Sequence, residues 1–302
     1  MPLQQPSPIA PPTHPSQGRG QRPRLALVLG SGGARCVAAL GAVDALAREG
    51  VRPDLVVGCG AGALFGAIVA LRMPPEHALQ AATELWSGAA TRRYRWRAWL
   101  QLIAPRLAGF DRDFALRDAG PMERRIRDAF GQRRLEDAPT ALRVAVTDAA
   151  SGEPVVLTRG SMADALRASL AAPFLLPPMT VAGRRLLDGT LSDPLPLSAA
   201  ADARGVIALG FEGAMPQRVD RASHLLAQVS TVMINNLMQA RSAAARAAGQ
   251  RVLHLELAPE RPVEPGDTAA LRRHFEAGGR AAQAQLPQIV ALLEGRAMRA
   301  AA

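Results

Sequence analysis

The chain has 302 residues, of which 48% are hydrophobic and 21% charged, a balance typical of a globular protein with a sizeable core. Its formal net charge of +10 permits nucleic acid or an anionic membrane as a partner. The arginines are spread along the chain without a zinc-finger or RNA-recognition motif, so we expect no nucleic-acid partner. Two cysteines, Cys36 and Cys59, exclude a disulfide framework and suit a reducing compartment.

Residues 1–23 are rich in Pro, Gln and Ser and lack the apolar core of a signal peptide, which predicts a disordered tail. No apolar run reaches the roughly 18 residues that a membrane-spanning helix requires. These observations predict a cytoplasmic protein, with peripheral contact to the inner membrane left open.

The ordered part of the chain begins with alternating strands and helices. The apolar run 25–29 predicts a strand buried on both faces, and the helical spacing over 35–49 predicts a helix closed by Gly50. A second strand over 54–58 and a second helix over 61–71 follow. Two strand–helix units within about fifty residues predict a parallel sheet with right-handed crossovers.

Further elements extend this pattern. Strands are predicted over 142–147, 154–158, 184–189, 205–211 and 252–257, and helices within 76–135 and over 161–170, 218–250 and 267–300. We therefore expect one α/β domain over 24–213, with a mostly parallel sheet between helical layers, and a helical C-terminal extension over 214–302.

A glycine-rich turn, Gly30-Ser-Gly-Gly, links the first strand to the first helix and offers N–H groups to an anion. A dinucleotide fingerprint would need a third glycine where Arg35 stands, and its acidic partner, Asp54, precedes the second strand instead of following it. The other candidate anion is the oxyanion of an acyl-transfer intermediate. That alternative needs a nucleophile-bearing turn after the second strand, where Gly58, Ala61 and Gly62 are small enough for one.

Four segments in order resemble the patatin-like phospholipases, lipid acyl hydrolases that use a Ser/Asp dyad. Residues 27–35 resemble the family's oxyanion-hole segment, 57–64 its G-x-S-x-G elbow, 167–178 its R-A-S-x-A-x-P-x-x-x-P-P stretch, and 187–190 its D-G-[GA] motif. The resemblance implies a three-layer α/β/α fold, a lipid or acyl ester substrate, and no metal or cofactor. It also implies a dyad aspartate at Asp188 and an oxyanion hole built from Gly32, Gly33, Ala34 and Arg35.

The chain departs from this family pattern at the nucleophile, where Gly60 stands in place of serine. Glycine cannot form an acyl-enzyme, although it adopts the strained elbow conformation easily. We therefore predict little or no hydrolysis, whether the serine was lost naturally or removed. Two alternatives remain: a catalytically silent acyl-lipid-binding or interaction protein, and a nucleotide-binding protein that uses residues 30–33.

Both cysteines lie beside this predicted site. Cys59 precedes the nucleophile position, and Cys36 replaces the glycine that in the resembled family follows the loop arginine. A thiol at a helix start can have a lowered pKa, so a substitute cysteine nucleophile is one hypothesis and two small buried side chains the other. The stretch 192–196 also departs from the family's N-N-x-P, behind Asp188.

Residues 92–107 interleave aromatic side chains with arginines and continue into an apolar helix. This pattern suits either peripheral contact with a bilayer or a helix whose tryptophans pack on the core.

Overall fold

The computed structural model describes residues 22–86, 95–215, 218–257 and 267–295. Residues 1–21 of the tail predicted over 1–23, and the residues Arg92, Arg93 and Tyr94, lie outside the described part. The described strands are β1 (Leu25–Leu29), β2 (Leu55–Cys59), β3 (Ala141–Asp148), β4 (Pro154–Leu157), β5 (Met179–Val181), β6 (Arg184–Asp188), β7 (Gly205–Leu209) and β8 (Val252–His254). The α-helices are α1 (Ala38–Arg48), α2 (Ala61–Ala70), α3 (Pro75–Leu85), α5 (Trp96–Ile103), α6 (Pro105–Ala108), α7 (Gly120–Phe130), α8 (Met162–Ser169), α9 (Ala222–Ala247), α10 (Thr268–Ala284) and α11 (Leu286–Leu293).

The strands form one sheet in the order β5-β6-β3-β2-β1-β7-β8, with β4 paired to β3. The pairs among β3, β2, β1, β7 and β8 are parallel, whereas β4 and β6 run antiparallel to β3. This arrangement confirms the predicted mostly parallel sheet. The carboxyl ends of parallel strands share one edge, so the turns after β1 and β2 lie side by side there.

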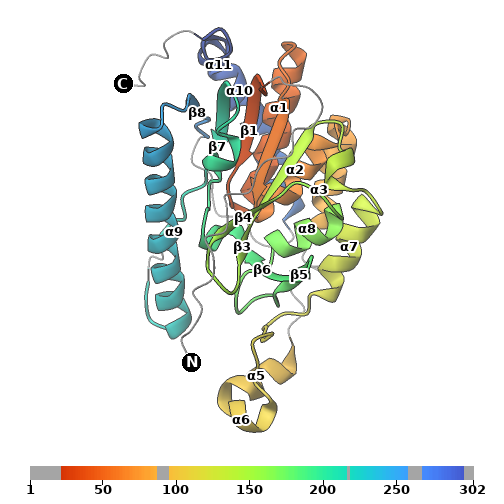
Figure 1. The fold of residues 1–302 in the computed structure, drawn as a ribbon, viewed down its shortest axis with the longest axis vertical. Helices are drawn as coiled ribbons and strands as arrows, with labels where there is room; N and C mark the ends of the chain where they lie inside the picture. The colour runs from red at the N-terminus through yellow and green to blue at the C-terminus, as the bar shows by residue number, and fades with distance from the viewer. Residues whose placement is uncertain (1–21, 87–94, 216–217, 258–266, 296–302) are drawn as a thin grey trace, which may run out of the picture.

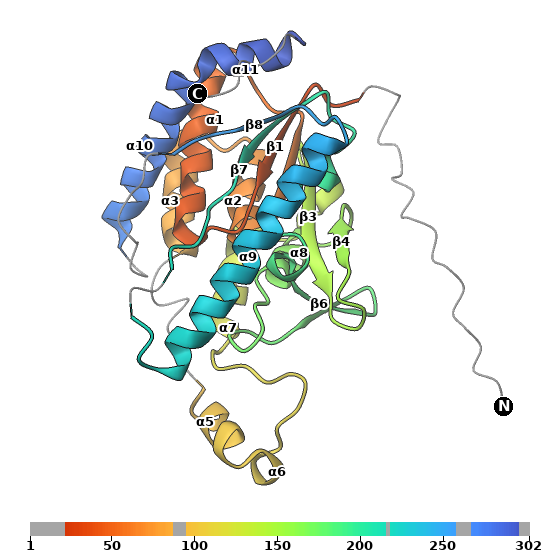
Figure 2. The ribbon, with the colours of Figure 1, turned by 90° about the vertical axis from the view of Figure 1, so that its left-hand side faces the viewer.

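Helices cover both faces of the sheet, as Figures 1 and 2 show. Leu25, Leu27 and Leu29 of β1 pack with α1, α2, α8 and α10 on one face. The alternate residues Ala26 and Val28 pack toward α9 on the other. Strand side chains alternate between faces, so a strand apolar on both sides belongs between two layers. The fold is therefore the expected three-layer α/β/α arrangement.

The structure refines two of the predicted elements and adds one. The helix predicted over 35–49 begins as a 3-10 turn, Gly33–Val37, and continues as α1; Gly50, at φ 73°, follows its end as expected. The C-terminal helix predicted over 267–300 is divided into α10 and α11 at Gln285, with Pro287 in the first turn of α11. Strand β5 has three residues and was not predicted, because so short a run gives no periodicity.

The segment after residue 213 is part of the same fold. Strand β8 extends the sheet by pairing with β7 in parallel. Helix α10 packs so closely on α1 that a Cβ built at Gly278 would lie 1.8 Å from the Ala38 carbonyl oxygen. The division at 213 remains a prediction about domain organisation.

Candidate active site

The predicted elbow is a sharp turn between β2 and α2. Gly60 has φ 57° and ψ −128°, which is a strained conformation for any residue with a side chain. The neighbouring glycines allow the chain to pass: a Cβ at Gly58 would lie 2.4 Å from Ala63 Cα, and a Cβ at Gly62 would lie 2.5 Å from the Leu29 carbonyl oxygen. The turn thus has the backbone geometry of a nucleophile elbow, with no side chain at its centre.

Asp188 ends β6 directly beside this turn. A Cβ built at Gly60 would lie 3.3 Å from Asp188 Oδ1. That oxygen accepts hydrogen bonds from the Thr190 N–H at 2.9 Å and the Thr190 hydroxyl at 2.6 Å. Burial raises the pKa of the Asp188 carboxyl to about 6, because removal from water disfavours the charged form. The Asp188 carboxyl therefore borders the elbow position and has a pKa above its ordinary value.

Ser31 is the closest side chain to the empty elbow position. A Cβ built at Gly60 would lie 2.7 Å from Ser31 Oγ and 3.2 Å from Ser31 Cβ. The Ser31 N–H donates to the Pro194 carbonyl at 3.2 Å, which fixes the loop after β1 against the segment that follows Asp188. The Ser31 side chain therefore occupies the space that a side chain at position 60 would need.

The four predicted oxyanion-hole residues have different surroundings. Gly33, at φ 59°, borders the cavity described below. Gly32 packs under Phe211, whose ring would lie 2.2 Å from an added Cβ, and the nearby Cys36 thiol donates to the Gly30 carbonyl at 3.4 Å. Arg35 donates to the Glu212 carbonyl at 3.0 Å and lies 5.2 Å from the centre of the Phe211 ring. Ala34 is buried.

These contacts distinguish Gly33 from Gly32 and Arg35 among the four residues. Among them only Gly33 lines the cavity, whereas Gly32 and Arg35 attach the glycine loop to the segment after β7. Ala61, the first residue of α2, also lines the cavity. The first N–H groups of a helix have no partner within the helix, and Ala61 stands at this position of α2.

Neither cysteine is available as a nucleophile. Cys36 and Cys59 are both fully buried. Burial raises the pKa of Cys36 to about 12, the opposite of the lowering expected at a helix start, and also raises the pKa of Cys59. Cys59 Sγ lies 4.0 Å from Asp188 Oδ1, whose negative charge further disfavours a thiolate. The thiolate, the reactive form, is thus suppressed at both positions.

The segment that follows Asp188 in the chain is held by polar contacts. The Thr147 hydroxyl donates to the Asp188 carbonyl at 2.8 Å and shares a 2.8 Å hydrogen bond with the Ser192 hydroxyl. Asp193 is buried and accepts from the Ser198 hydroxyl at 3.1 Å, and burial raises its pKa to about 6. The sequence that replaces N-N-x-P therefore builds an ordered turn.

A cavity of about 250 Å³ opens over the elbow. Its polar and charged lining residues are Ser31, Asp188, Arg117 and Asp118, and its larger apolar part is formed by Trp86, Met122, Leu170, Ala172, Leu175 and Leu176. Another cavity, of about 220 Å³, lies between α1 and α3 and contains none of the motif residues. We refer to the first as the Trp86 cavity. An apolar wall above a few polar groups suits a hydrocarbon chain that ends in a polar head.

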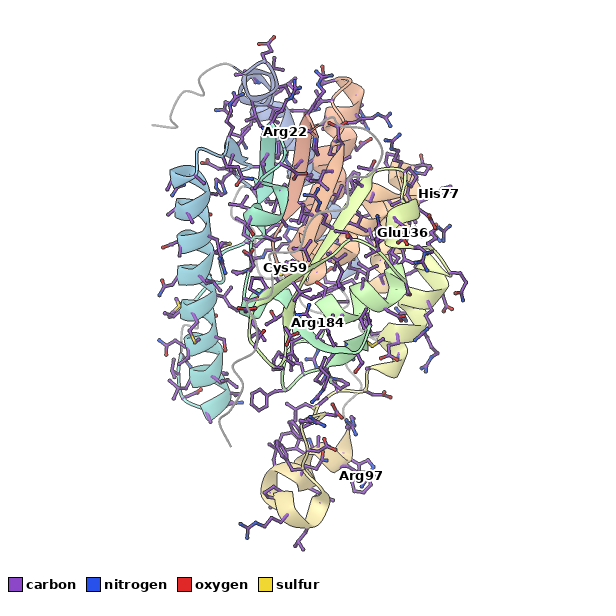
Figure 3. All side chains as sticks on the ribbon, viewed as in Figure 1. Arg22, Cys59, His77, Arg97, Glu136 and Arg184 are labelled. Atoms are coloured by element: carbon purple, nitrogen blue, oxygen red, sulfur yellow. The ribbon has the colours of Figure 1, made fainter. Side chains whose placement is uncertain are left out.

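The R-A-S segment supports this cavity from α8. Arg167 is buried and donates at 3.0 Å both to Glu123 of α7 and to the Pro177 carbonyl. Figure 3 shows Cys59, at the end of β2, in the middle of the molecule and Arg97, on α5, at its lower end.

A strand, a sharp strained turn, a helix and a buried aspartate define an α/β protein of the acyl-hydrolase type in fold and backbone. A family model described as "Patatin-like phospholipase" matches residues 27–201. The chain belongs to the patatin-like phospholipase family.

Individual relatives agree with this assignment. An uncharacterized NTE family protein of Mycobacterium tuberculosis is 34% identical over 195 residues, which cover 63% of this chain and 50% of that protein. Lysophospholipase NTE1 of Yarrowia lipolytica is 31% identical over 174 residues, 58% of this chain and 12% of that protein. The match therefore spans half or less of these relatives.

Among solved structures, VipD from Legionella pneumophila is similar over 91% of this chain and 67% of its own, with 15% identity and a TM-score of 0.46.

Two residues near the elbow, Ser31 and Ser169, were not predicted from the sequence to be site residues. In the sequence, Ser31 is one residue of the glycine-rich turn after the first strand, and Ser169 is one residue of the R-A-S stretch. Nothing in their spacing shows that the fold brings both to Gly60.

Proposed function

We propose that this chain binds the acyl group of a lipid ester in the Trp86 cavity, and that residue 60 performs no nucleophilic step. One observation carries the proposal: the elbow, its buried aspartate and the apolar cavity are present together, while the elbow residue has no side chain. Family membership supports a lipid substrate. The chemistry expected of an elbow serine needs an atom that glycine lacks.

The geometry also favours a polar end for the bound acyl group. The ester carbonyl would lie over Gly60, within reach of the N–H groups of Gly33 and Ala61, and the hydrocarbon chain along Leu170, Leu175 and Trp86. N–H donors at the start of a helix favour a partially negative oxygen, because the helix dipole is positive there. Binding in this pose requires no group at position 60.

A binding experiment tests this proposal. Ala172→Phe would fill part of the Trp86 cavity, so we expect it to weaken the binding of dansyl-undecanoic acid tenfold or more, measured by dansyl fluorescence. The matched control is Ala47→Phe, which enlarges an alanine lining the other cavity. Equal affinities for wild type and Ala172→Phe would show that the acyl chain is not held in the Trp86 cavity.

We further propose that α5 and α6 contact a membrane surface. Their large apolar side chains are exposed: Trp96 is 72% exposed, Trp99 57% and Leu107 92%. This exposure contradicts the alternative of a tryptophan face packed on the core. Both views place α5, α6 and the N-terminal end of α9 at the same end of the molecule (Figures 1 and 2). That end of α9 exposes further apolar side chains: Leu225, Leu226, Val229 and Met233.

Aromatic and aliphatic side chains beside arginines favour the boundary between lipid headgroups and acyl chains. Arg97 in α5 and Arg106 in α6 add positive charge to this end of the molecule. No helix in the described part of the chain is long and apolar enough to cross a bilayer. The supported mode of contact for these two helices is therefore at the bilayer surface.

The nucleotide alternative has weaker support. In the glycine loop, Gly32 packs on Phe211 and Arg35 is engaged with the carbonyls of Phe211 and Glu212. The cavity next to the loop is lined mainly by apolar side chains, and besides Arg117 and Asp118 it contains the carboxyl of Asp188. A phosphate there would meet that carboxylate at neutral pH.

A further inference from the structure

The hydroxyl missing from the elbow has a counterpart on the neighbouring loop. Ser31 Oγ lies 2.7 Å from the position that a Cβ of residue 60 would occupy, and Asp188 Oδ1 lies 3.3 Å from the same position. Both oxygens thus border one small space, which a serine at position 60 would otherwise fill. Gly60 and Ser31 are sterically linked, because a side chain at one position excludes the present rotamer at the other.

The Ser31 hydroxyl is also accessible to a ligand. Ser31 is partly exposed and lines the Trp86 cavity together with Asp188 and Gly33. Within the described residues no hydrogen bond engages its Oγ, although its backbone N–H is held by the Pro194 carbonyl. A serine side chain has three staggered rotamers, so rotation about its Cα–Cβ bond can move Oγ within the space between Gly60 and Asp188.

We propose that Ser31 is the nucleophile of this site, with the Asp188 carboxylate as its base. The inference rests on the proposed binding of an acyl ester in the Trp86 cavity. Ser31 Oγ forms a bond to the ester carbonyl carbon, and its proton passes to Asp188. The carbonyl electron pair moves to oxygen, where the Gly33 N–H stabilises it. When this tetrahedral intermediate re-forms the carbonyl, the bond to the alkoxide leaving group breaks. The alkoxide takes the proton from Asp188 and departs as the alcohol.

Water completes the reaction. Asp188, again a carboxylate, accepts a proton from water as the water oxygen attacks the acyl-Ser31 ester, and the products are a carboxylic acid and free Ser31. The general acid–base role therefore stays with one carboxyl throughout. The hydroxyl reaches the acyl carbon from the loop after β1 instead of the turn after β2.

The test is covalent capture by an alkyl fluorophosphonate probe, which phosphonylates an activated serine with loss of fluoride. The labelled residue is identified by peptide mass spectrometry. We expect wild type to be labelled at Ser31, and Ser31→Ala to lose at least ninety per cent of the labelling. Ser151→Ala, in an exposed turn, is the matched control and should label as wild type does. Thermal unfolding of each variant shows whether it remains folded.

A double variant separates this inference from the proposed function. Ser31→Gly with Gly60→Ser removes the steric conflict and places the hydroxyl on the elbow, so it should be labelled at residue 60. If the double variant is labelled and wild type is not, Ser31 is not the nucleophile, but the acyl site stands. If neither is labelled, Ser31 is not the nucleophile, and the acyl site is then judged by the dansyl-undecanoic acid titration alone. Labelling of wild type at any residue other than Ser31 would also overturn the inference.

Turnover gives a second readout. Wild type should hydrolyse a short-chain nitrophenyl ester, and Asp188→Asn should slow both this hydrolysis and the labelling of Ser31 at least tenfold. A rate of labelling that is the same with aspartate and asparagine at position 188 would contradict the role of Asp188 as the base.

Discussion

The backbone N–H of Gly60 donates a hydrogen bond of 2.8 Å to Oγ of Ser169. The same hydroxyl donates to the carbonyl of Ala145 at 2.9 Å. One fully buried side chain on α8 thus joins the elbow to β3 and satisfies two buried backbone groups. The strained turn is therefore held in place by α8, independently of any side chain at its centre.

We therefore predict that Ser169→Ala destabilises the protein by about 2–4 kcal/mol, because it leaves two buried backbone groups without a partner. The measurement is urea unfolding followed by circular dichroism. Ser151→Ala, which removes a 3.2 Å hydrogen bond to Glu153 N–H in an exposed turn, is the control and should cost about 0.5 kcal/mol or less. Equal losses in the two variants would show that the Ser169 contacts are not important for stability.

Gly60→Ala should destabilise the fold by about 2 kcal/mol, because it combines backbone strain with a Cβ 2.7 Å from Ser31 Oγ. Adding Ser31→Gly should recover part of this loss, since it removes the clash but not the strain. The coupling free energy comes from a double-mutant cycle in urea. Gly152→Ala, at φ 75° with nothing within 4 Å of its added Cβ, measures strain without a clash. Additive effects at positions 60 and 31 would rule out the steric link.

Asp188→Asn should stabilise the protein at pH 7, by as much as about 3 kcal/mol. The folded-state pKa of about 6 lies above the ordinary 3.8, so ionising the buried carboxyl opposes folding. The penalty is absent below pH 3.8, grows as the pH rises to about 6, and is constant above that. The stability difference between variant and wild type should follow this curve in urea unfolding at pH 4.5, 5.5 and 7. A difference independent of pH would contradict the raised pKa.

Trp96→Ala with Trp99→Ala should reduce sedimentation with anionic phosphatidylglycerol vesicles at least fivefold, because both exposed rings would enter the interface. Val290→Ala, on α11 at the other end of the molecule, is the control for loss of an exposed apolar side chain (Figure 1). Unchanged sedimentation of the double variant would exclude these two rings as the contact. Sedimentation with neutral vesicles shows how much of the membrane binding depends on the positive charge of the arginines.

Much of the fold was predictable because its signals are local. Runs such as 25–29 and 205–209 are continuous and apolar, as strands between two helical layers must be. Gly60 and Asp188 could be matched to a family pattern because the motifs preserve order and spacing. Their proximity followed from that resemblance alone, since 128 residues separate them in the sequence.

The neighbours of the elbow could not be predicted in the same way. The contact of Ser31 with the space above Gly60 depends on the register of β1 against β2, and on the rotamer in which Ser31 is held. A helix start can lower the pKa of a thiol such as Cys36, but complete burial outweighs that effect. Such outcomes depend on distances between elements, which the order of residues does not specify.

The pairing of β8 with β7 has a practical consequence. A chain ended near residue 213 would leave one side of β7 without its partner and α1 without the helix that now lies over it. Exposed strand edges recruit other chains, so such a fragment would be prone to aggregation. The family model ends at residue 201. Material for crystallisation or assay should therefore retain the chain through α11.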